Sequence, residues 1–335
     1  ILTQGHYDHV GGTDLLSDPG TDIVMQANWE SWRRDNDLLA TFRAANASFA
    51  WADAISAALT FAKGRGRLPA QSSPVPTIIV DDELTLRIGE RELVLRATPG
   101  GETTDSLVIW LPDDEVCLCG NVFGALFGHI PNLVTMRGDR YRDALTVIET
   151  IETVRELSPS VLLTGHFDPI SGKDRIRDEL TRLRDAVAYL HDETVAGMNA
   201  GKDVYTLMRE VTLPPALQVG EGYGMVRWNI RAIWENYAGW FHHRSTTELY
   251  AVAPEDFSND IVALAGADAI VGRARKALAD GEPLRAIRLT EIVRHVEPHH
   301  DGAKHVLRAA HEQLLEASTN FWESAWLRKQ IAELT

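Results

Sequence analysis

The sequence predicts an α/β domain followed by an all-helical domain, on three observations. Residues 77–119 alternate between apolar and polar side chains with the period of β-strands. Amphipathic helical patterns run almost without interruption from about residue 173 to the end. The chain has 335 residues, of which 44% are hydrophobic, and this is enough for two cores. We therefore expect domains at residues 1–172 and 173–335.

The first half is expected to open with an apolar strand at residues 1–3. A helical segment should run from residue 28 to about 63, and an amphipathic helix should occupy residues 142–157. The Gly, Pro and Ser residues between 64 and 76 predict a loop. Short apolar or alternating runs predict the other strands, at residues 22–25, 77–80, 84–88, 92–95, 106–110, 115–119 and 160–164.

The second half is predicted to consist of helices at residues 174–196, 204–211 and 223–237, with a break at Pro214-Pro215. From residue 261 onward, Ala-rich amphipathic helices alternate with short polar turns. This alternation is typical of helix hairpins that stack as repeats, although no fixed repeat period is present. No apolar run reaches the length of a transmembrane helix.

The formal charge of -15 argues against a nucleic-acid partner and against binding to an anionic membrane. An anionic substrate would therefore need a local basic group. The only cysteines, Cys117 and Cys119, share one face of a predicted strand and are expected to be buried core thiols. Two cysteines exclude a disulfide scaffold. A soluble protein is expected, and a cytoplasmic one if no signal precedes Ile1.

The residues that carry chemistry begin at the start of the chain, where His6, Asp8 and His9 lie directly after an apolar run and before a Gly pair. Imidazole nitrogen and carboxylate oxygen are ligands that a divalent ion such as zinc prefers. The pattern therefore predicts a metal site and a metal-dependent hydrolase. The alternative is a polar loop whose side chains only cap a helix starting near Gly12.

A further candidate ligand, His166, follows Gly165 at the end of the predicted strand 160–164. We expect Asp8, His9 and His166 to form one subsite, because catalytic zinc is commonly held by three protein ligands that leave one position open for water. The pairs His242-His243 and His299-His300 are less suitable, because adjacent side chains point apart.

The opening motif resembles that of the metallo-β-lactamase superfamily, whose pattern is H-x-H-x-D-H. Here Gln4 stands in place of the first His. The resemblance implies an α/β metallo-β-lactamase-like domain whose N-terminal strands are missing from this chain, so we expect a truncated N-terminus. It also implies that the carboxylate bridging two metal ions is replaced by Gly120 or Asn121. An amide oxygen binds one ion weakly and cannot neutralise two.

The segment Thr98-Pro99-Gly100-Gly101-Glu102 resembles the P-G-H-T loop of the superfamily, with Glu102 in the ligand position. A Glu at this position is a feature of the alkyl sulfatase branch, which also carries an α-helical dimerisation domain. The resemblance thus implies a homodimer. It also implies a second, altered metal subsite formed by Gln4, His6 and Glu102.

Two further segments resemble alkyl sulfatases. Asn132 and Arg137 match the pattern N-L-x-x-x-R-G, and Arg offers a planar fork of donors for sulfate or phosphate oxygens. Trp228 begins a W-N-I-R-A segment where the branch has a His that faces the sulfate group. Trp228 could instead form the wall of an apolar pocket for an alkyl or aryl tail.

We therefore expect a metal-dependent hydrolase of a small-molecule ester, most plausibly an alkyl or aryl sulfate. Zn²⁺ is the expected ion, with Mn²⁺ or Fe²⁺ as alternatives. Asp8 would also accept a hydrogen bond from the bound water, and Asn132 and Arg137 would orient the anion. A phosphoester, thioester or lactone is the first alternative substrate. The departures at Gln4, Asn121 and Trp228 leave open a dimeric binding or scaffold protein without catalytic activity.

Overall fold

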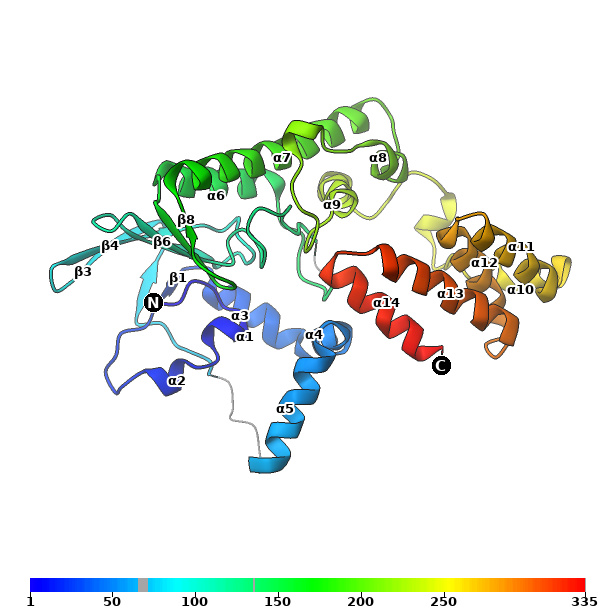
Figure 1. The fold of residues 1–335 in the computed structure, drawn as a ribbon, viewed down its shortest axis with the longest axis horizontal. Coiled ribbons are helices and arrows are strands. Elements are labelled where there is room, and N and C mark those ends of the chain that lie inside the picture. The colour runs from blue at the N-terminus through cyan, green and yellow to red at the C-terminus, as the bar shows by residue number, and fades with distance from the viewer. Residues whose placement is uncertain (66–71, 135, 335) are drawn as a thin grey trace. The chain divides into compact units, whose positions relative to one another are not determined.

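A six-stranded sheet organises the first part of the structure, a computed structural model that describes residues 1–65, 72–134 and 136–334 (Figure 1). Its strands follow one another in the order β3-β4-β5-β6-β7-β8. Every neighbouring pair is antiparallel except β6 and β7, which are parallel. The strands are β3 (Glu83–Ile88), β4 (Arg91–Ala97), β5 (Leu107–Leu111), β6 (Val116–Gly120), β7 (Val161–Thr164) and β8 (Ile170–Ser171).

One edge of this sheet gathers the loops that carry the candidate ligands. The parallel strands β6 and β7 both end there, and the Gly165 N–H donates to the Gly120 carbonyl at 2.8 Å. The antiparallel strand β5 begins at the same edge, where the Leu107 N–H donates to the carbonyl of Thr3 at 2.9 Å. The start of the chain and the loops before β5 and after β6 and β7 therefore meet.

A smaller parallel sheet pairs β1 (Val24–Gln26) with β2 (Ile78–Val80). The predicted strand at residues 1–3 is not assigned as a strand. Instead, Leu2 donates to Val24 at 3.0 Å and Thr3 accepts from Leu107, so the segment bridges the two sheets with one backbone bond on each side. One backbone hydrogen bond on each side is too few for a β-strand assignment. The two bonds nevertheless fix the position of the segment that leads into His6.

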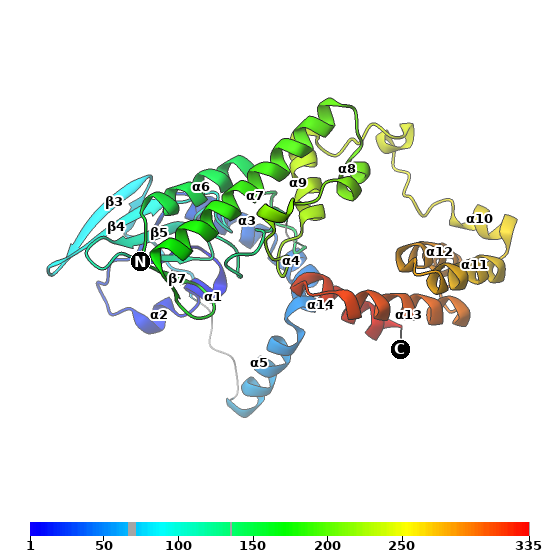
Figure 2. The same ribbon diagram turned by 45° about the horizontal axis from the view of Figure 1, so that its top comes forward.

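Helices cover one face of the six-stranded sheet, and α6 and α7 run side by side over it in both views (Figures 1 and 2). Asp143 caps α6 by accepting from the Thr146 N–H, and the apolar face of α7 is buried at Ile176, Leu180 and Leu183. The helices of this part are α1 (Tyr7–Val10), α2 (Thr13–Leu16), α3 (Trp29–Leu38), α4 (Ala40–Ala47), α5 (Ala52–Arg65), α6 (Ala144–Glu156), α7 (Lys173–Asn199), α8 (Val204–Glu210) and α9 (Val226–Ala238), with short 3₁₀ turns at Ser48–Trp51 and Pro215–Leu217.

The predicted helical segment 28–63 is present as α3, α4 and α5, but much of its apolar surface is exposed. No residue of α4 is buried, and Leu38 and Phe42 are exposed. Spacing in the sequence predicts which residues share a helix face and not whether another element covers that face. The loop predicted at residues 64–76 lies partly outside the described residues.

Cys117 and Cys119 are buried in strand β6, as their apolar surroundings in the sequence predicted. Burial raises the pKa of Cys119 to about 12 and also raises that of Cys117. Because the thiolate is the reactive form, we expect the native protein to resist iodoacetamide at pH 8. Mass spectrometry should find both thiols alkylated only after denaturation, and rapid native labelling would contradict their burial.

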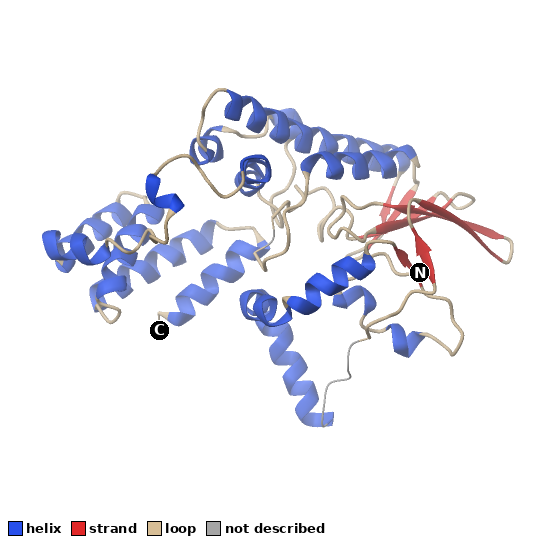
Figure 3. Ribbon diagram, turned by 180° about the vertical axis from the view of Figure 1, so that it is seen from behind, coloured by secondary structure: helices blue, strands red, loops and turns tan. Residues whose placement is uncertain are grey.

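The chain separates into two units by internal contacts, residues 1–239 and 240–335. Unit 2 is helical, as Figure 3 shows for the C-terminal segment, and its core is built from small residues such as Ala274, Ala286 and Ala303. Its helices are α10 (Ser258–Ala265), α11 (Ala267–Ala279), α12 (Pro283–Val296), α13 (Asp301–Ala317) and α14 (Phe321–Glu333), with a 3₁₀ turn at Thr246–Leu249. The domain boundary expected near residue 172 stays a prediction. Among the described helices, none is long and apolar enough to span a bilayer.

Candidate metal centre

Three candidate ligands converge at the sheet edge. The ligand atoms of Asp8, His9 and His166 all lie within 4.8 Å of one another. The Oδ2 atom of Asp8 is 3.5 Å from Nε2 of His9 and 3.4 Å from Nε2 of His166. The two imidazole rings meet edge to face, with centroids 5.9 Å apart. Two nitrogens and one oxygen at this separation fit a divalent ion with three protein ligands.

Local backbone geometry brings these side chains together. Asp8 and His9 lie in the one-turn helix α1, which starts directly after His6. Gly165 allows the loop after β7 to approach them, because a Cβ atom there would lie 2.6 Å from Cε1 of His9 and 2.3 Å from Oδ1 of Asn121. A larger residue here would displace the side chains of His9 and Asn121, so the Gly-His order in the sequence has a structural reason.

The state of His9 also suits a metal ligand. Burial lowers the pKa of its imidazole, which favours the neutral form that binds metal. Its Nε2 atom is buried and makes no hydrogen bond within the described part of the chain. A buried polar atom without a partner is costly and calls for an explanation, which a bound ion would supply.

Asn121 links the two predicted subsites. Its Nδ2 atom is 3.2 Å from Nε2 of His166, and its backbone N–H donates to Oε1 of Gln4 at 3.0 Å. The fully buried Gln4 also places Nε2 at 2.8 Å from Nδ1 of His6. Gln4 and His6 are therefore in mutual contact within the second predicted subsite.

Glu102 completes this subsite from the loop before β5. Its carboxylate is buried, and Oε2 lies 3.6 Å from Nδ1 of His6. Tyr223 donates a hydrogen bond to Oε1 at 3.1 Å. Burial alone would raise the pKa of Glu102, but contacts with His6 and the nearby guanidinium groups of Arg142 and Arg137 lower it well below its usual range. Glu102 is thus an ionised carboxylate inside the protein.

Arg137 lies against the same subsite. Its Nη2 atom is 2.7 Å from Nε2 of His6, and its Nε donates to Asp139 at 2.7 Å. Asp139 also pairs with Arg43 of helix α4 at 3.1 Å. The basic group that the sequence placed in the site is therefore held rigidly beside His6, although the chain as a whole is acidic.

Asn132 is buried in the loop between β6 and α6, and neither atom of its amide has a hydrogen-bond partner among residues that the structure describes. Arg142 donates from Nη1 to the Asn132 backbone carbonyl, so a buried guanidinium lies beside the backbone of this residue. An unpaired buried amide next to a cation suits an oxygen-rich anion.

A clasp from helix α9 holds the loop that carries Asn132. Asn229, which is fully buried, donates from Nδ2 to the carbonyl of Pro131 at 2.7 Å and accepts at Oδ1 from the N–H of Leu133 at 3.0 Å. The neighbouring Trp228 is half-buried on α9. In the described part of the chain, Trp228 makes no hydrogen bond or ring contact with the cluster, so its role in binding a tail stays a prediction.

Replacement of Asn229 by Leu should destabilise unit 1, because it leaves a buried carbonyl and a buried N–H of the loop unpaired. We expect a loss of about 2–4 kcal/mol in the free energy of unfolding, measured by urea denaturation. Asn236→Leu on the exposed face of the same helix is the matched control and should change stability little. Equal stability of the two variants would show that the hydrogen bonds of Asn229 do not stabilise the loop.

Sequence reasoning did not identify Arg43, Arg142, Tyr223 or Asn229. Arg142 lies among Arg137, Arg140 and other polar residues, and nothing in the sequence separates the buried guanidinium from exposed ones. Tyr223 is only one of many aromatic residues in the helical half. The Gly-rich stretch Gly220-Glu221-Gly222-Tyr223-Gly224 was the available signal, since close backbone approach requires small residues.

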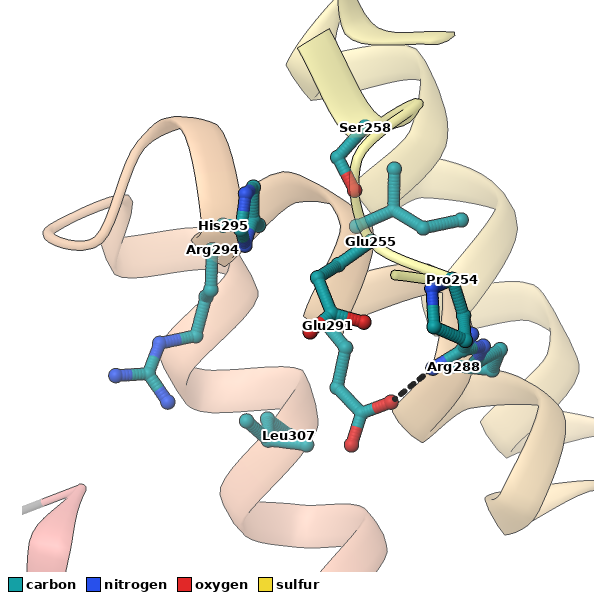
Figure 4. Close-up of a pocket in the computed structure, with 9 residues that line it drawn as sticks. Pro254, Glu255, Ser258, Arg288, Glu291, Arg294, His295 and Leu307 are labelled. Carbon is teal, nitrogen blue, oxygen red and sulfur yellow. Dashed lines mark hydrogen bonds and ion pairs between the residues drawn. The ribbon is translucent and has the colours of Figure 1, made fainter. Parts of the chain in front are cut away.

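A cavity of about 380 Å³ lies elsewhere, entirely within unit 2 (Figure 4). Its walls carry charges of both signs, including the ion pair between Arg288 and Glu291 at 3.3 Å. Among the described residues, Asp8, His9 and His166 form the cluster that could bind a metal ion, and none of the three lines this cavity. The candidate metal ligands therefore lie in unit 1.

Comparisons with known proteins agree with this geometry. Residues 1–166 match the metallo-beta-lactamase superfamily, and residues 204–335 match the alkyl sulfatase dimerisation domain. The chain thus belongs to the metallo-β-lactamase superfamily. Within it, the chain falls in the alkylsulfatase-like branch, with the helical dimerisation domain following the metallo-β-lactamase fold. The family and fold class expected from the motifs are confirmed.

Relatives are consistent with this assignment, and a solved structure shows the same fold. A linear primary-alkylsulfatase from Pseudomonas sp. (strain ATCC 19151) is 29% identical over 77% of this chain and 49% of its own length. An alkyl/aryl-sulfatase of Saccharomyces cerevisiae is 27% identical over 75% of this chain and 40% of its own length. The structure of an inverting sec-alkylsulfatase from Pseudomonas sp. superposes with a TM-score of 0.83 at 22% identity, over 99% of this chain and 56% of that protein. The chain spans about half the length of these relatives.

Proposed function

We propose that the chain hydrolyses alkyl or aryl sulfate esters with one zinc ion held by Asp8, His9 and His166. The observation that carries the proposal is the convergence of these three ligand atoms within 4.8 Å at an edge that also buries Arg137 and Arg142. The names of the relatives, which are alkylsulfatases, support the choice of substrate.

The roles of the residues follow from their chemistry. When bound, the ion supplies Lewis acidity and makes a water molecule nucleophilic at neutral pH. Asp8, whose side chain is half exposed, accepts a hydrogen bond from the attacking water. The unpaired amide of Asn132 and the guanidinium of Arg137 bind the sulfate oxygens and orient the ester.

Steady-state kinetics on a panel of alkyl sulfates, phosphoesters, thioesters, lactones and neutral esters tests this proposal. We expect sulfate release from alkyl sulfates that disappears with a chelator and returns with zinc, and Mn²⁺ and Fe²⁺ are compared in the same assay. Turnover of only a different ester class would change the substrate and keep the metal site. No turnover of any ester by metal-loaded protein would favour a binding or scaffold role.

We further propose that the chain forms a homodimer through its helical half, as the match to an alkyl sulfatase dimerisation domain suggests. Exposed apolar side chains such as Trp240, Tyr250 and Phe257 would contribute to the interface. An obligate dimer interface buries more than about 2,000 Å² in total. Light scattering at micromolar concentration should give twice the mass of the chain, and a monomer would contradict the prediction.

A further inference from the structure

We infer that the subsite formed by Gln4, His6 and Glu102 binds no second metal ion. The guanidinium of Arg137 supplies the positive charge that an ion would bring, and the N–H groups of Arg137 and Gln4 face the ring nitrogens of His6. This inference rests on the proposed function, since it assumes that the neighbouring subsite of Asp8, His9 and His166 holds a metal. It concerns how the second subsite works without an ion.

The first argument is that neither nitrogen of His6 is available to a metal. Nδ1 lies 2.8 Å from the Gln4 amide nitrogen, and Nε2 lies 2.7 Å from the Arg137 guanidinium. A neutral imidazole has one lone pair, and in either tautomer that lone pair faces an N–H group. The orientation of the Gln4 amide is fixed, because its oxygen accepts from the backbone N–H of Asn121 at 3.0 Å.

The second argument is charge. The buried carboxylate of Glu102, which a dication would neutralise, already receives a hydrogen bond from Tyr223 and lies near Arg137 and Arg142. Asp139 is likewise balanced by Arg137 and by Arg43. Arg43, Arg137 and Arg142 therefore exceed Glu102 and Asp139 by one positive charge. The carboxyl of Asp105, three residues beyond Glu102, is also buried, and burial raises its pKa.

The third argument is steric. Position 120, directly before Asn121, has φ +50, and a Cβ atom there would lie 2.5 Å from Oγ1 of Thr3. A carboxylate from this position is therefore disfavoured by both backbone strain and contact. The neighbouring subsite differs in two respects, since Asp8 is half exposed and His9 Nε2 is buried without a hydrogen bond in the described chain. In that subsite the Asn121 amide nitrogen lies 3.2 Å from Nε2 of His166, so the contrast with His6 rests on His9 and Asp8.

Zinc stoichiometry, measured by equilibrium dialysis and elemental analysis of the full chain, tests the inference without using activity. We expect one equivalent in the native protein, one in His6→Ala and none in His166→Ala. Two equivalents in the native protein would overturn the inference and leave the metal site of the proposed function intact. No zinc in the native protein would overturn the proposed function itself. If His6→Ala lost zinc and His166→Ala retained it, the ion would lie in the subsite of Gln4, His6 and Glu102. That outcome would also overturn the inference.

A gain of binding tests the role of the guanidinium. We expect Gln4→His alone to keep one equivalent, and Gln4→His combined with Arg137→Ala to take up a second. The matched control combines Gln4→His with Arg140→Ala, because Arg140 is exposed and pairs with Asp35. If Gln4→His alone bound a second equivalent of zinc, Arg137 would not exclude the ion. The same would follow if the folded double variant bound no second equivalent. Circular dichroism establishes folding, and the native, His6→Ala and His166→Ala stoichiometries still decide the inference if the double variant unfolds.

Discussion

Replacement of His166 by Ala should abolish zinc binding and lower kcat/KM on alkyl sulfates by about 10³-fold or more, which corresponds to roughly 4 kcal/mol of transition-state stabilisation. His166 is one of three ligand atoms within 4.8 Å, and its removal leaves only two adjacent residues of α1 to hold an ion. Two ligands on one short helix cannot enclose a tetrahedral metal.

A thermal shift separates loss of metal from loss of fold. Zinc that binds only the native state raises the melting temperature, so the native chain should be stabilised by added zinc and the His166→Ala variant should not. His305→Ala, which removes an exposed histidine on α13, is the matched control. Retention of zinc-dependent stabilisation and turnover in His166→Ala would exclude the subsite, whatever the activity of the native chain.

The part of the site that sequence could predict is the part built from local patterns. His6, Asp8 and His9 are neighbours in the chain, and the Gly before His166 marks a loop that ends a strand. Strand order then brings these segments to one edge, because β6 and β7 are parallel and end there, and the antiparallel strand β5 begins there beside Thr3. Alternation and apolar runs were sufficient to find most of the strands involved.

The electrostatic surroundings of the site could not be predicted in the same way. Burial of Arg142 and of Glu102 depends on which loops fold over them, and sequence spacing contains no such information. Asn229 lies 98 residues from the carbonyl of Pro131 that it binds, so only the tertiary fold shows the clasp. The apolar pattern of α4 likewise predicted a helix face and not its exposure.

These surroundings also explain how an acidic chain could bind an anionic substrate. The formal charge of -15 would repel sulfate esters at long range. Screening limits that repulsion to about 10 Å at ordinary ionic strength, whereas buried guanidinium groups act at short range and are screened much less. Arg137 and Arg142 therefore determine the local field at the sheet edge, and the net charge of the surface matters little there.

Replacement of Arg137 by Ala should accordingly lower kcat/KM on anionic esters by roughly tenfold to hundredfold, because a charge-assisted hydrogen bond contributes about 1.5–3 kcal/mol. Arg137→Lys should recover only part of this loss, since a point charge cannot reproduce the fork that contacts His6 and Asp139 together. Turnover of neutral esters should change much less, which distinguishes lost anion binding from general damage to the site.

The exposed Arg140 is the matched control for this experiment, because it lies in the same loop and its pairing with Asp35 is far less buried. Arg140→Ala should therefore keep the activity of the native chain on every ester. An Arg137→Ala variant that turns over all anionic esters at the native rate would remove Arg137 from substrate binding. Such a result would not contradict the zinc stoichiometry. Arg137 would then act only as the cation that neutralises Glu102 inside the protein.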